Sequence, residues 1–481
     1  MRVRIMSMTR IERECRNQKV KVRLWQLTCG LVMAVFLAGC ASGEETEEPI
    51  EINQAKEMPA EESNTDVTAN SGGELAENTS RKADEKLTGE TAGEAAGELP
   101  EDISQEQEET ADEPEITLVM VGDILLHTPV AESGLQEDGS YDFSAVFAQM
   151  KEEIQVADLA LVNQEVILGG AQLGVSGYPA FNAPFELGDA LVDAGFDVIL
   201  HATNHALDKG KSGILNCLSF WQENYPDTAV LGIHASQEEQ QEIYVYEQQG
   251  IRIAILNYTY GTNGIPLPGD MLYAVDLLDR ERVEADLRKA GELADFVVVC
   301  PHWGTEYSLN ATKEQEGWAA LFAENGADLI LGTHPHVIEP IRWVEDGKVS
   351  DGENVGESMG PDGTLVYYSL GNFVNWTSGT GAGVANRMVG GMAEVTIGLD
   401  ETGNVVIKSY DMEPLVCHVE QGFGGVTVYP LEQYTEELAE RNEIVKQDDS
   451  FSLEYCQRLV QDVFEQNKIT VKSKVKRLLN E

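Results

Sequence analysis

Five short apolar runs in this chain each lead into residues of the kind that bind metal ions. Runs of Val, Ile and Leu bounded by Gly or Pro predict buried strands. In α/β sheets, ligands bind beyond the carboxyl ends of the strands, where Asp, Glu, Asn and His suit hard or borderline divalent cations. The pattern therefore predicts a metal site at a sheet edge. The runs and their following motifs are Ile116–Val121 with Gly122-Asp123, Leu159–Val162 with Asn163-Gln164-Glu165, Val198–Leu200 with Thr203-Asn204-His205, Phe296–Cys300 with His302, and Leu329–Leu331 with His334-Pro335-His336.

Helical patterns alternate with these runs. Phe185–Gly195, Arg280–Leu293 and Lys313–Asn325 each predict a helix that precedes one of the strands. Ile251–Leu256 and Leu365–Leu370 predict two further strands. This alternation indicates βα units and an α/β fold with helices on the faces of a sheet.

The C-terminal part changes character. Met392–Leu399 and Val405–Tyr410 flank a turn sequence with glycine, which predicts a hairpin. Asp346–Gly363 is rich in Gly, Asp and Glu and predicts a loop. The last fifty residues predict mainly helix, over Glu432–Val445 and Leu453–Leu479.

The N-terminus has the three parts of a secretory signal. A basic stretch precedes an apolar one, Leu24–Gly39, which is shorter than the about 20 residues that span a bilayer. Leu37-Ala38-Gly39-Cys40 resembles the bacterial lipobox, which implies cleavage before Cys40 and lipidation there. We expect a lipid-anchored protein on the extracytoplasmic face of the cell membrane. An uncleaved signal anchor with a chance cysteine is the alternative.

The next segment is acidic, rich in Ala, Gly, Thr and Ser, and poor in aromatic residues. Such a composition buries too little apolar surface to offset chain entropy, so we expect a disordered tether. The predicted organisation is a signal peptide at 1–39, an acidic disordered linker at 40–115, a metal-binding domain at 116–414 and a mostly helical C-terminal extension at 415–481.

Charge and cysteines narrow the functional classes. The net charge of −50 argues against nucleic acid as a partner, because that role needs a basic surface. Cys217, Cys300, Cys417 and Cys456 have no spacing that defines a disulfide, and Cys300 lies in an apolar run that predicts burial.

Six motifs, in this order and spacing, resemble the CapA family, which is associated with bacterial poly-γ-glutamate capsule synthesis. The resemblance covers roughly Ile116 to Pro414. That family is similar to calcineurin-like metallophosphoesterases, which implies a metallophosphatase-like two-sheet sandwich flanked by helices, with a two-metal site at the strand ends. The motifs are Gly122-Asp123, Asn163-x-Glu165, Asn204-His205-Ala206-Leu207-Asp208, His302-Trp303-Gly304-x-Glu306-Tyr307, Gly332-x-His334-Pro335-His336 and Ser369-Leu370-Gly371-Asn372-Phe373.

The resemblance implies roles for single residues. His205 would act as general acid or orient the substrate, and Glu165 would bridge two divalent metal ions, Mn, Fe or Zn. Residues i and i+2 of an extended chain face the same way, so both histidines of the last motif can reach one site. The implied metal ligands are Asp123, Glu165, Asn204, His302, His334 and His336, and the substrate-binding candidates are Asn163, Glu306 and Asn372.

Several positions keep a structural alternative. Asp123 could cap a helix, Glu306 could face water, and Ser369–Phe373 could be a turn. Where phosphoesterases have Asp-x-His, residue 125 is Leu, and His127 could substitute or be a surface histidine. The remaining histidines, His201, His234 and His418, are expected to be structural.

Two classes of function follow. The first is metal-assisted hydrolysis or transfer, most simply of a phosphate ester, with His205 protonating the leaving group. The second is a non-catalytic subunit that binds or assembles an anionic polymer. In either class the expected partners are the membrane, through the lipid anchor, capsule synthase subunits and an anionic polymer.

Overall fold

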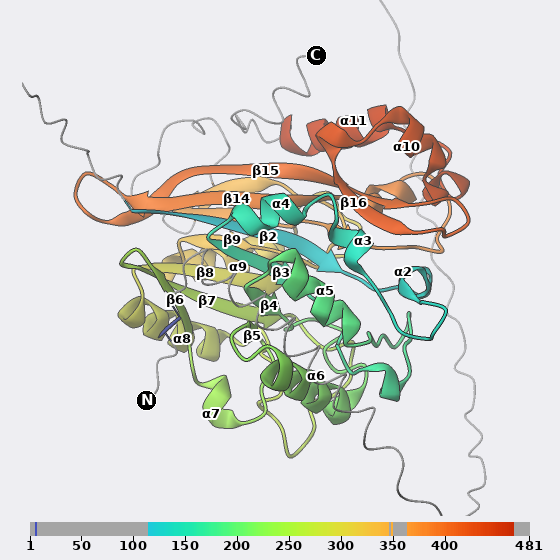
Figure 1. Ribbon diagram of the computed structural model, residues 1–481. Coiled ribbons are helices and arrows are strands. Elements are labelled where there is room, and N and C mark those ends of the chain that lie inside the picture. Colours follow the sequence, from blue (N-terminus) through green and yellow to red (C-terminus); the bar gives the residue numbers. More distant parts are fainter. Residues whose placement is uncertain (1–4, 7–113, 346–347, 350–362, 466–481) are drawn as a thin grey trace, which may run out of the picture. The chain divides into compact units, whose positions relative to one another are not determined.

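The computed structural model describes residues 5–6, 114–345, 348–349 and 363–465 (Figure 1). All of these belong to one compact unit of the chain. The predicted apolar signal stretch, Cys40 and almost all of the acidic linker lie outside the described residues, as do most of the loop predicted at 346–363 and residues 466–481.

Two eight-stranded sheets form the core of this unit. In the first sheet, β7, β8, β9 and β12 run parallel, with antiparallel neighbours β6 and β10. Its order is β1 (Ile5–Met6), β6 (Tyr244–Gln248), β7 (Ile251–Thr259), β8 (Phe296–His302), β9 (Leu329–Leu331), β12 (Gly363–Tyr367), β10 (Ile341–Glu345) and β11 (Lys348–Val349).

The second sheet combines a parallel half with an antiparallel half. Strands β2 to β5 run parallel, whereas β14, β15 and β16 continue the sheet as antiparallel neighbours. The order is β16 (Val426–Pro430), β15 (Val405–Val419), β14 (Val389–Leu399), β2 (Glu115–Ile124), β3 (Leu159–Asn163), β4 (Val198–Leu200) and β5 (Ala229–Leu231), and the short β13 (Asn372–Val374) pairs with β2.

Helices connect the strands and cover the sheets. The α-helices are α2 (Thr128–Gly134), α3 (Ser144–Phe147), α4 (Lys151–Val156), α5 (Glu186–Ala194), α6 (Gly210–Asn224), α7 (Gln237–Gln240), α8 (Arg280–Leu293), α9 (Lys313–Glu324), α10 (Glu436–Arg441) and α11 (Leu453–Glu465). Short 3₁₀ helices are η1 (Ala171–Leu173), η2 (Val384–Met388), η3 (Leu431–Gln433) and η4 (Glu443–Lys446). No helix of the described residues is both long and apolar enough to cross a bilayer.

The first sheet is buried on both faces. Along β8, Val298 and Cys300 join an apolar cluster that also takes side chains from the second sheet. Val297 and Val299 point to the opposite face and pack with residues of α8 and α9, including Phe322. Since successive side chains of a strand alternate between faces, burial on both explains why this strand reads as one continuous apolar run.

The structure confirms the predicted α/β fold with two sheets and flanking helices. All five apolar runs form strands, and β2 and β8 extend beyond the predicted ends, to Ile124 and His302. The helix predicted at Arg280–Leu293 is α8, and the predicted hairpin is formed by β14 and β15. Cys300 is buried, as expected, and it is one of four free cysteines among the described residues.

The C-terminal part differs from the prediction. The expected domain boundary at 414 falls inside β15, which continues to Val419, and β16 extends the sheet further. The helix predicted at Glu432–Val445 is divided into η3, α10 and η4. Asn442 adopts an extended backbone after α10, and its side chain donates to the Cys417 carbonyl, so tertiary contacts override the helical pattern.

Two other expectations are corrected. The strand predicted at Leu365–Leu370 ends at Tyr367, and the chain turns at Gly371, whose φ is +62°. Within the loop predicted at 346–363, Lys348–Val349 forms β11 and Gly363 begins β12. Helix α6, which follows the Asn204-His205 motif, was not predicted.

A close backbone approach fixes the loop before β13. The Asp123 N–H donates to the Gly371 carbonyl over 3.0 Å. A Cβ atom on Gly122 would lie 1.9 Å from the same carbonyl oxygen, so only glycine allows this approach. The contact holds Asn372 beside Asp123 near the carboxyl end of β2.

Candidate metal centre

Asp123 is one of the two buried carboxylates of the candidate centre. It lies near the carboxyl end of β2, paired in register with Asn163 at the end of β3 and with Asn372 at the start of β13. The Asn163 amide donates to Asp123 Oδ1 over 2.8 Å. The neighbouring strands therefore fix the carboxylate of Asp123 in the interior, where it is fully buried.

The first sheet supplies the histidines. His302 is the last residue of β8, and it forms a bridge with Thr333, the residue that precedes His334. His334 and His336 are both buried. The sequence prediction that these strand ends converge is thus confirmed in space.

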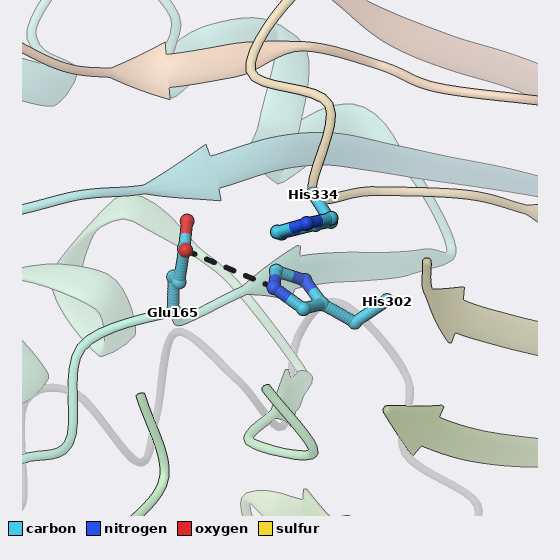
Figure 2. Close-up of side chains that lie close together, drawn as sticks. All are labelled: Glu165, His302 and His334. Atoms are coloured by element: carbon cyan, nitrogen blue, oxygen red, sulfur yellow. Dashed lines mark ion pairs between the residues drawn. The ribbon is translucent and has the colours of Figure 1, made fainter. Parts of the chain in front are cut away.

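The side chains form three overlapping groups whose candidate ligand atoms lie within 4.8 Å of one another. Glu165 belongs to two of the groups, and His334 and His336 also belong to two each. Figure 2 shows the His334 ring next to the His302 ring, with the Glu165 carboxylate facing His302. The groups are Glu165–His302–His334, Glu306–His334–His336 and Asp123–Glu165–His336.

Short contacts join the carboxylates to the imidazoles. His336 Nδ1 lies 3.2 Å from Asp123 Oδ2 and 3.7 Å from Glu165 Oε2. Glu165 Oε1 lies 3.7 Å from His302 Nε2 (Figure 2). Because both carboxylates face the same imidazoles, the arrangement presents oxygen and nitrogen ligands toward one small volume.

Several polar atoms of this cluster are buried without a partner. Both carboxylate oxygens of Glu165, His334 Nδ1 and Asn163 Oδ1 make no hydrogen bond to the described residues. A buried polar group left unpaired costs about 1–3 kcal/mol, and a charged one costs more. A divalent cation would coordinate these atoms and remove the cost, so the residues fit a metal site.

The pKa values of the cluster's side chains also fit a metal site. Burial holds the pKa of Glu165 well above its usual range, against the opposing charge of His336 and with a smaller contribution from the Asp123 charge. Burial lowers the pKa of His302 and His334 well below the usual value, so both imidazoles are neutral, as metal ligands must be. For His336, burial lowers the pKa, but Glu165 and Asp123 outweigh it and raise the pKa to about 9. A cation would therefore displace a proton from this position.

The backbone of the last motif is strained, which corrects the expectation of an extended chain. His334 has a φ of +99° and His336 a φ of +61°, in the left-handed region that disfavours residues with side chains. Each such residue costs about 1–3 kcal/mol unless the surroundings enforce it. The Tyr307 N–H donates to the Pro335 carbonyl over 2.8 Å and helps to hold the turn. Both rings still reach the cluster, with centroids 5.7 Å apart.

Asn204 and His205 differ in their contacts, although they are adjacent. Asn204 Oδ1 lies 3.0 Å from His302 Nε2, which places it at the cluster. His205 Nδ1 lies 2.7 Å from Asp208 Oδ2, whereas its Nε2 lies 3.9 Å from Glu165. The Asp208 carboxylate accepts from Nδ1, so it orients the ring with Nε2 toward the cluster.

The three substrate-binding candidates occupy different positions. Asn163 and Asn372 are buried, and Asn372 contacts His336 through Oδ1–Nδ1 at 3.1 Å and through a bond to its carbonyl. These two asparagines hold Asp123 and His336 in place. Glu306 is exposed and forms a candidate metal group with His334 and His336.

Sequence reasoning missed several residues around the cluster. Asp208 lies within one of the six motifs, and its spacing of three residues from His205 could have indicated the pair. The Tyr260 ring is tilted against the His334 ring, with centroids 4.6 Å apart, and Asn263 contacts Asn204 at 3.3 Å. No sequence pattern marks Tyr260 or Asn263. Arg387, whose charge acts on His127, also lies outside every motif.

The histidines outside the motifs are placed as follows. His127 contacts Phe181, whose ring also contacts His205, and burial followed by the charges of His336 and His205 lowers the His127 pKa to about 4. It joins none of the candidate metal groups of the described residues. His201, His234 and His418 contact Cys217, Asp276 and Tyr434, respectively, and they also lie outside these groups.

Comparison with known proteins gives a family. Residues 117–377 match the family described as "Bacterial capsule synthesis protein PGA_cap". The chain is 28% identical over 274 residues to "Capsule biosynthesis protein CapA" of Bacillus anthracis, covering 54% of this chain and 61% of that protein. It is 31% identical over 200 residues to "PGA biosynthesis protein CapA" of Bacillus subtilis (strain 168), covering 39% and 45%. The match thus spans roughly half of each relative.

The similarity to solved structures is low, both in sequence identity and in TM-score. A putative 5'-nucleotidase from Staphylococcus aureus has 17% identity and a TM-score of 0.37, covering 62% of this chain and 54% of that one. A 5'-nucleotidase precursor from Thermus thermophilus has 16% identity and a TM-score of 0.37, covering 63% and 54%. Similarity at this level does not assign the activity of these proteins to this chain.

We expect the double substitution His334→Ala with His336→Ala to remove most of the divalent metal from the purified protein, because it deletes ligand atoms from all three groups. Metal analysis by mass spectrometry and circular dichroism would check this. His418→Ala is the control, since His418 is buried outside the groups. Unchanged metal content in the double variant would refute the assignment.

The strained backbone gives a second expectation. With metal removed, His336→Gly should be more stable than His336→Ala by about 1 kcal/mol, because glycine accepts the positive φ. Both variants lack the imidazole, so the difference in unfolding free energy, measured by urea denaturation, reports the backbone strain less the extra unfolded-state entropy of glycine. Equal stability, or a more stable alanine variant, would show that the strain does not exceed the entropic cost of glycine and would contradict this expectation.

Proposed function

Because the chain belongs to the bacterial capsule synthesis protein family PGA_cap, we propose that it serves synthesis, export or attachment of a capsule or envelope polymer. Its part would be a metal-dependent hydrolysis or transfer reaction, most simply at a phosphate ester. The observation that carries this proposal is a set of buried carboxylate and imidazole atoms, without hydrogen-bond partners among the described residues, beside an oriented histidine.

The cluster suits two cations of Mn, Fe or Zn type, because its three groups overlap and Glu165, His334 and His336 each belong to two of them. When bound, divalent ions would activate a water molecule and stabilise charge on an oxyanion. The chain's own residues would do the rest. Asn163 would hold Asp123, and the strained turn would hold His334 and His336 in the ligand geometry.

His205 would protonate the leaving group. Asp208 accepts from Nδ1, so Nε2 is the atom that faces the cluster and exchanges the proton. The edge of the Phe181 ring packs against the imidazole at 4.6 Å and restricts its rotation. Orientation by a carboxylate and an aromatic ring is what a general acid requires in order to act on a held substrate.

The alternative is a non-catalytic subunit that binds an anionic polymer. The names of the two relatives speak of capsule and PGA biosynthesis and not of hydrolysis. Bound cations could hold the carboxylates of a polymer without any reaction. A metal-loaded protein that hydrolyses none of a panel of phosphate esters would favour this alternative.

We also propose a lipid anchor at Cys40, on the extracytoplasmic face of the membrane, where synthase subunits would be neighbours. The support is the Leu37–Cys40 pattern after a basic and then an apolar stretch. Cys40→Ser should abolish lipid attachment and leave the protein unprocessed or released, as shown by mass spectrometry of the mature N-terminus and by cell fractionation. Cys29→Ala is the control and should leave processing intact. Normal processing and membrane retention of Cys40→Ser would contradict the anchor.

For catalysis, His205→Ala should keep its metal and lower turnover of alkyl phosphate esters by roughly 10²–10⁴-fold. The loss should be smaller for a nitrophenyl ester, because its leaving group needs less protonation. The control is His234→Ala, since His234 also pairs with an aspartate, at 2.6 Å, but outside the candidate metal groups. An emptied metal site in His205→Ala would make this residue a ligand, and an unchanged turnover would remove it from the reaction.

A further inference from the structure

Arg387 is a cation that has no carboxylate partner among the described residues. The sequence holds 83 acidic and 33 basic residues, so most basic side chains have an acidic group available. Yet no ion pair of the described residues includes Arg387. Its Nη1 donates to Thr377 Oγ1 over 2.7 Å, and its buried Nε has no hydrogen-bond partner among these residues.

The guanidinium of Arg387 lies close to the candidate metal centre. Its central carbon stands 3.5 Å from the centroid of the Tyr307 ring, and that ring lies 6.0 Å from the ring of His336. After burial, His336 and His205, the charge of Arg387 also contributes to the lowered pKa of His127. One aromatic ring thus separates this cation from a predicted ligand.

The backbone of Arg387 is tied to the same histidine. Asn372 Nδ2 donates to the Arg387 carbonyl over 3.0 Å, while Asn372 Oδ1 lies 3.1 Å from His336 Nδ1. Tyr307 is 45% exposed, so the stacked pair borders solvent next to the buried cluster. A ligand held at the cluster can therefore extend toward Arg387.

The C-terminal segment positions η2, which carries Arg387. Asp448 Oδ2 accepts from the Gly383 N–H over 2.9 Å and from Ala385 over 3.3 Å. Tyr455 donates to Asn386, and Gln447 donates to the Thr377 carbonyl over 3.0 Å. Apart from Thr377 itself, these residues lie beyond 377, where the family match ends. C-terminal residues of the chain thus hold Arg387 beside the centre.

We propose that Arg387, stacked on Tyr307 and fixed by Thr377, forms an anion subsite for a substrate that carries a second carboxylate or phosphate near the group held at the metal cluster. The guanidinium has five N–H donors in a planar fork that matches these oxyanions, and only one of its donors has a partner among the described residues. The inference rests on the proposed function, because it assigns a substrate class to that site.

The test compares two probes that differ in one anionic group. Propylphosphonate offers only a phosphonate to the cluster, whereas 3-phosphonopropionate adds a carboxylate. The metal-loaded full chain should bind 3-phosphonopropionate about 10- to 100-fold more tightly by calorimetry, the range expected for a hydrogen bond to a charged group. Ethane-1,2-diphosphonate, in place of the carboxylate probe, shows whether a phosphate-type or a carboxylate group fits better, and preference for either supports the subsite.

Arg387→Gln should abolish this preference and leave metal content and propylphosphonate binding unchanged. Arg387→Lys should keep part of it, because a lysine retains the charge without the fork. If Arg387→Gln does not fold, Thr377→Val serves instead, since it frees the guanidinium and should weaken the preference. The control is Arg342→Gln, because Arg342 also lies over a tyrosine ring, Tyr368, but pairs with Glu316.

The outcomes separate the two proposals. Equal binding of all probes by the wild type, or full preference in Arg387→Gln, overturns the subsite and leaves the metal centre standing. Absence of turnover with the preference intact removes the hydrolase and keeps the subsite. A metal-loaded protein that binds no phosphonate overturns both.

Discussion

The burial of two carboxylates between two sheets is the constraint on which the rest of this site depends. Asp123 and Glu165 are fully buried, and the oxygens of Glu165 have no hydrogen-bond donor among the described residues. Buried charge without compensation is costly, so a cation or a proton must accompany it. The imidazoles of His302 and His334 are neutral and can act as ligands, whereas the imidazole of His336 holds a proton. The two sheets meet where these imidazoles face the carboxylates.

Backbone geometry is arranged to serve that burial. Gly122 lets the Gly371 carbonyl approach β2, and this brings Asn372 beside Asp123. His334 and His336 occupy unfavourable left-handed conformations that aim both rings at the carboxylates. The backbone at His334 and His336 is thus locally strained, which fixes the ligand geometry, as is common at functional sites.

The fold and much of the candidate site could be predicted from the sequence because they depend on local patterns. Strands buried on both faces give continuous apolar runs, and their ends are marked by Gly, Pro and polar residues. The turn of His334 and His336 could not be predicted, because tertiary hydrogen bonds enforce it. Arg387 and Tyr260 escaped for a similar reason, since folding alone brings them to the cluster. The C-terminal helix pattern failed where Asn442 bonds to β15.

The position of β15 determines where the chain can be divided without disrupting the domain. This strand begins beside β14, crosses the expected boundary at 414 and ends beside β16. The segment after it holds η2 through Asp448 and Tyr455. A gene fusion or deletion that breaks the chain near 414 would divide a strand and release the support of η2. The structural unit that supports the centre therefore extends at least to Tyr455, beyond residue 377 where the family match ends.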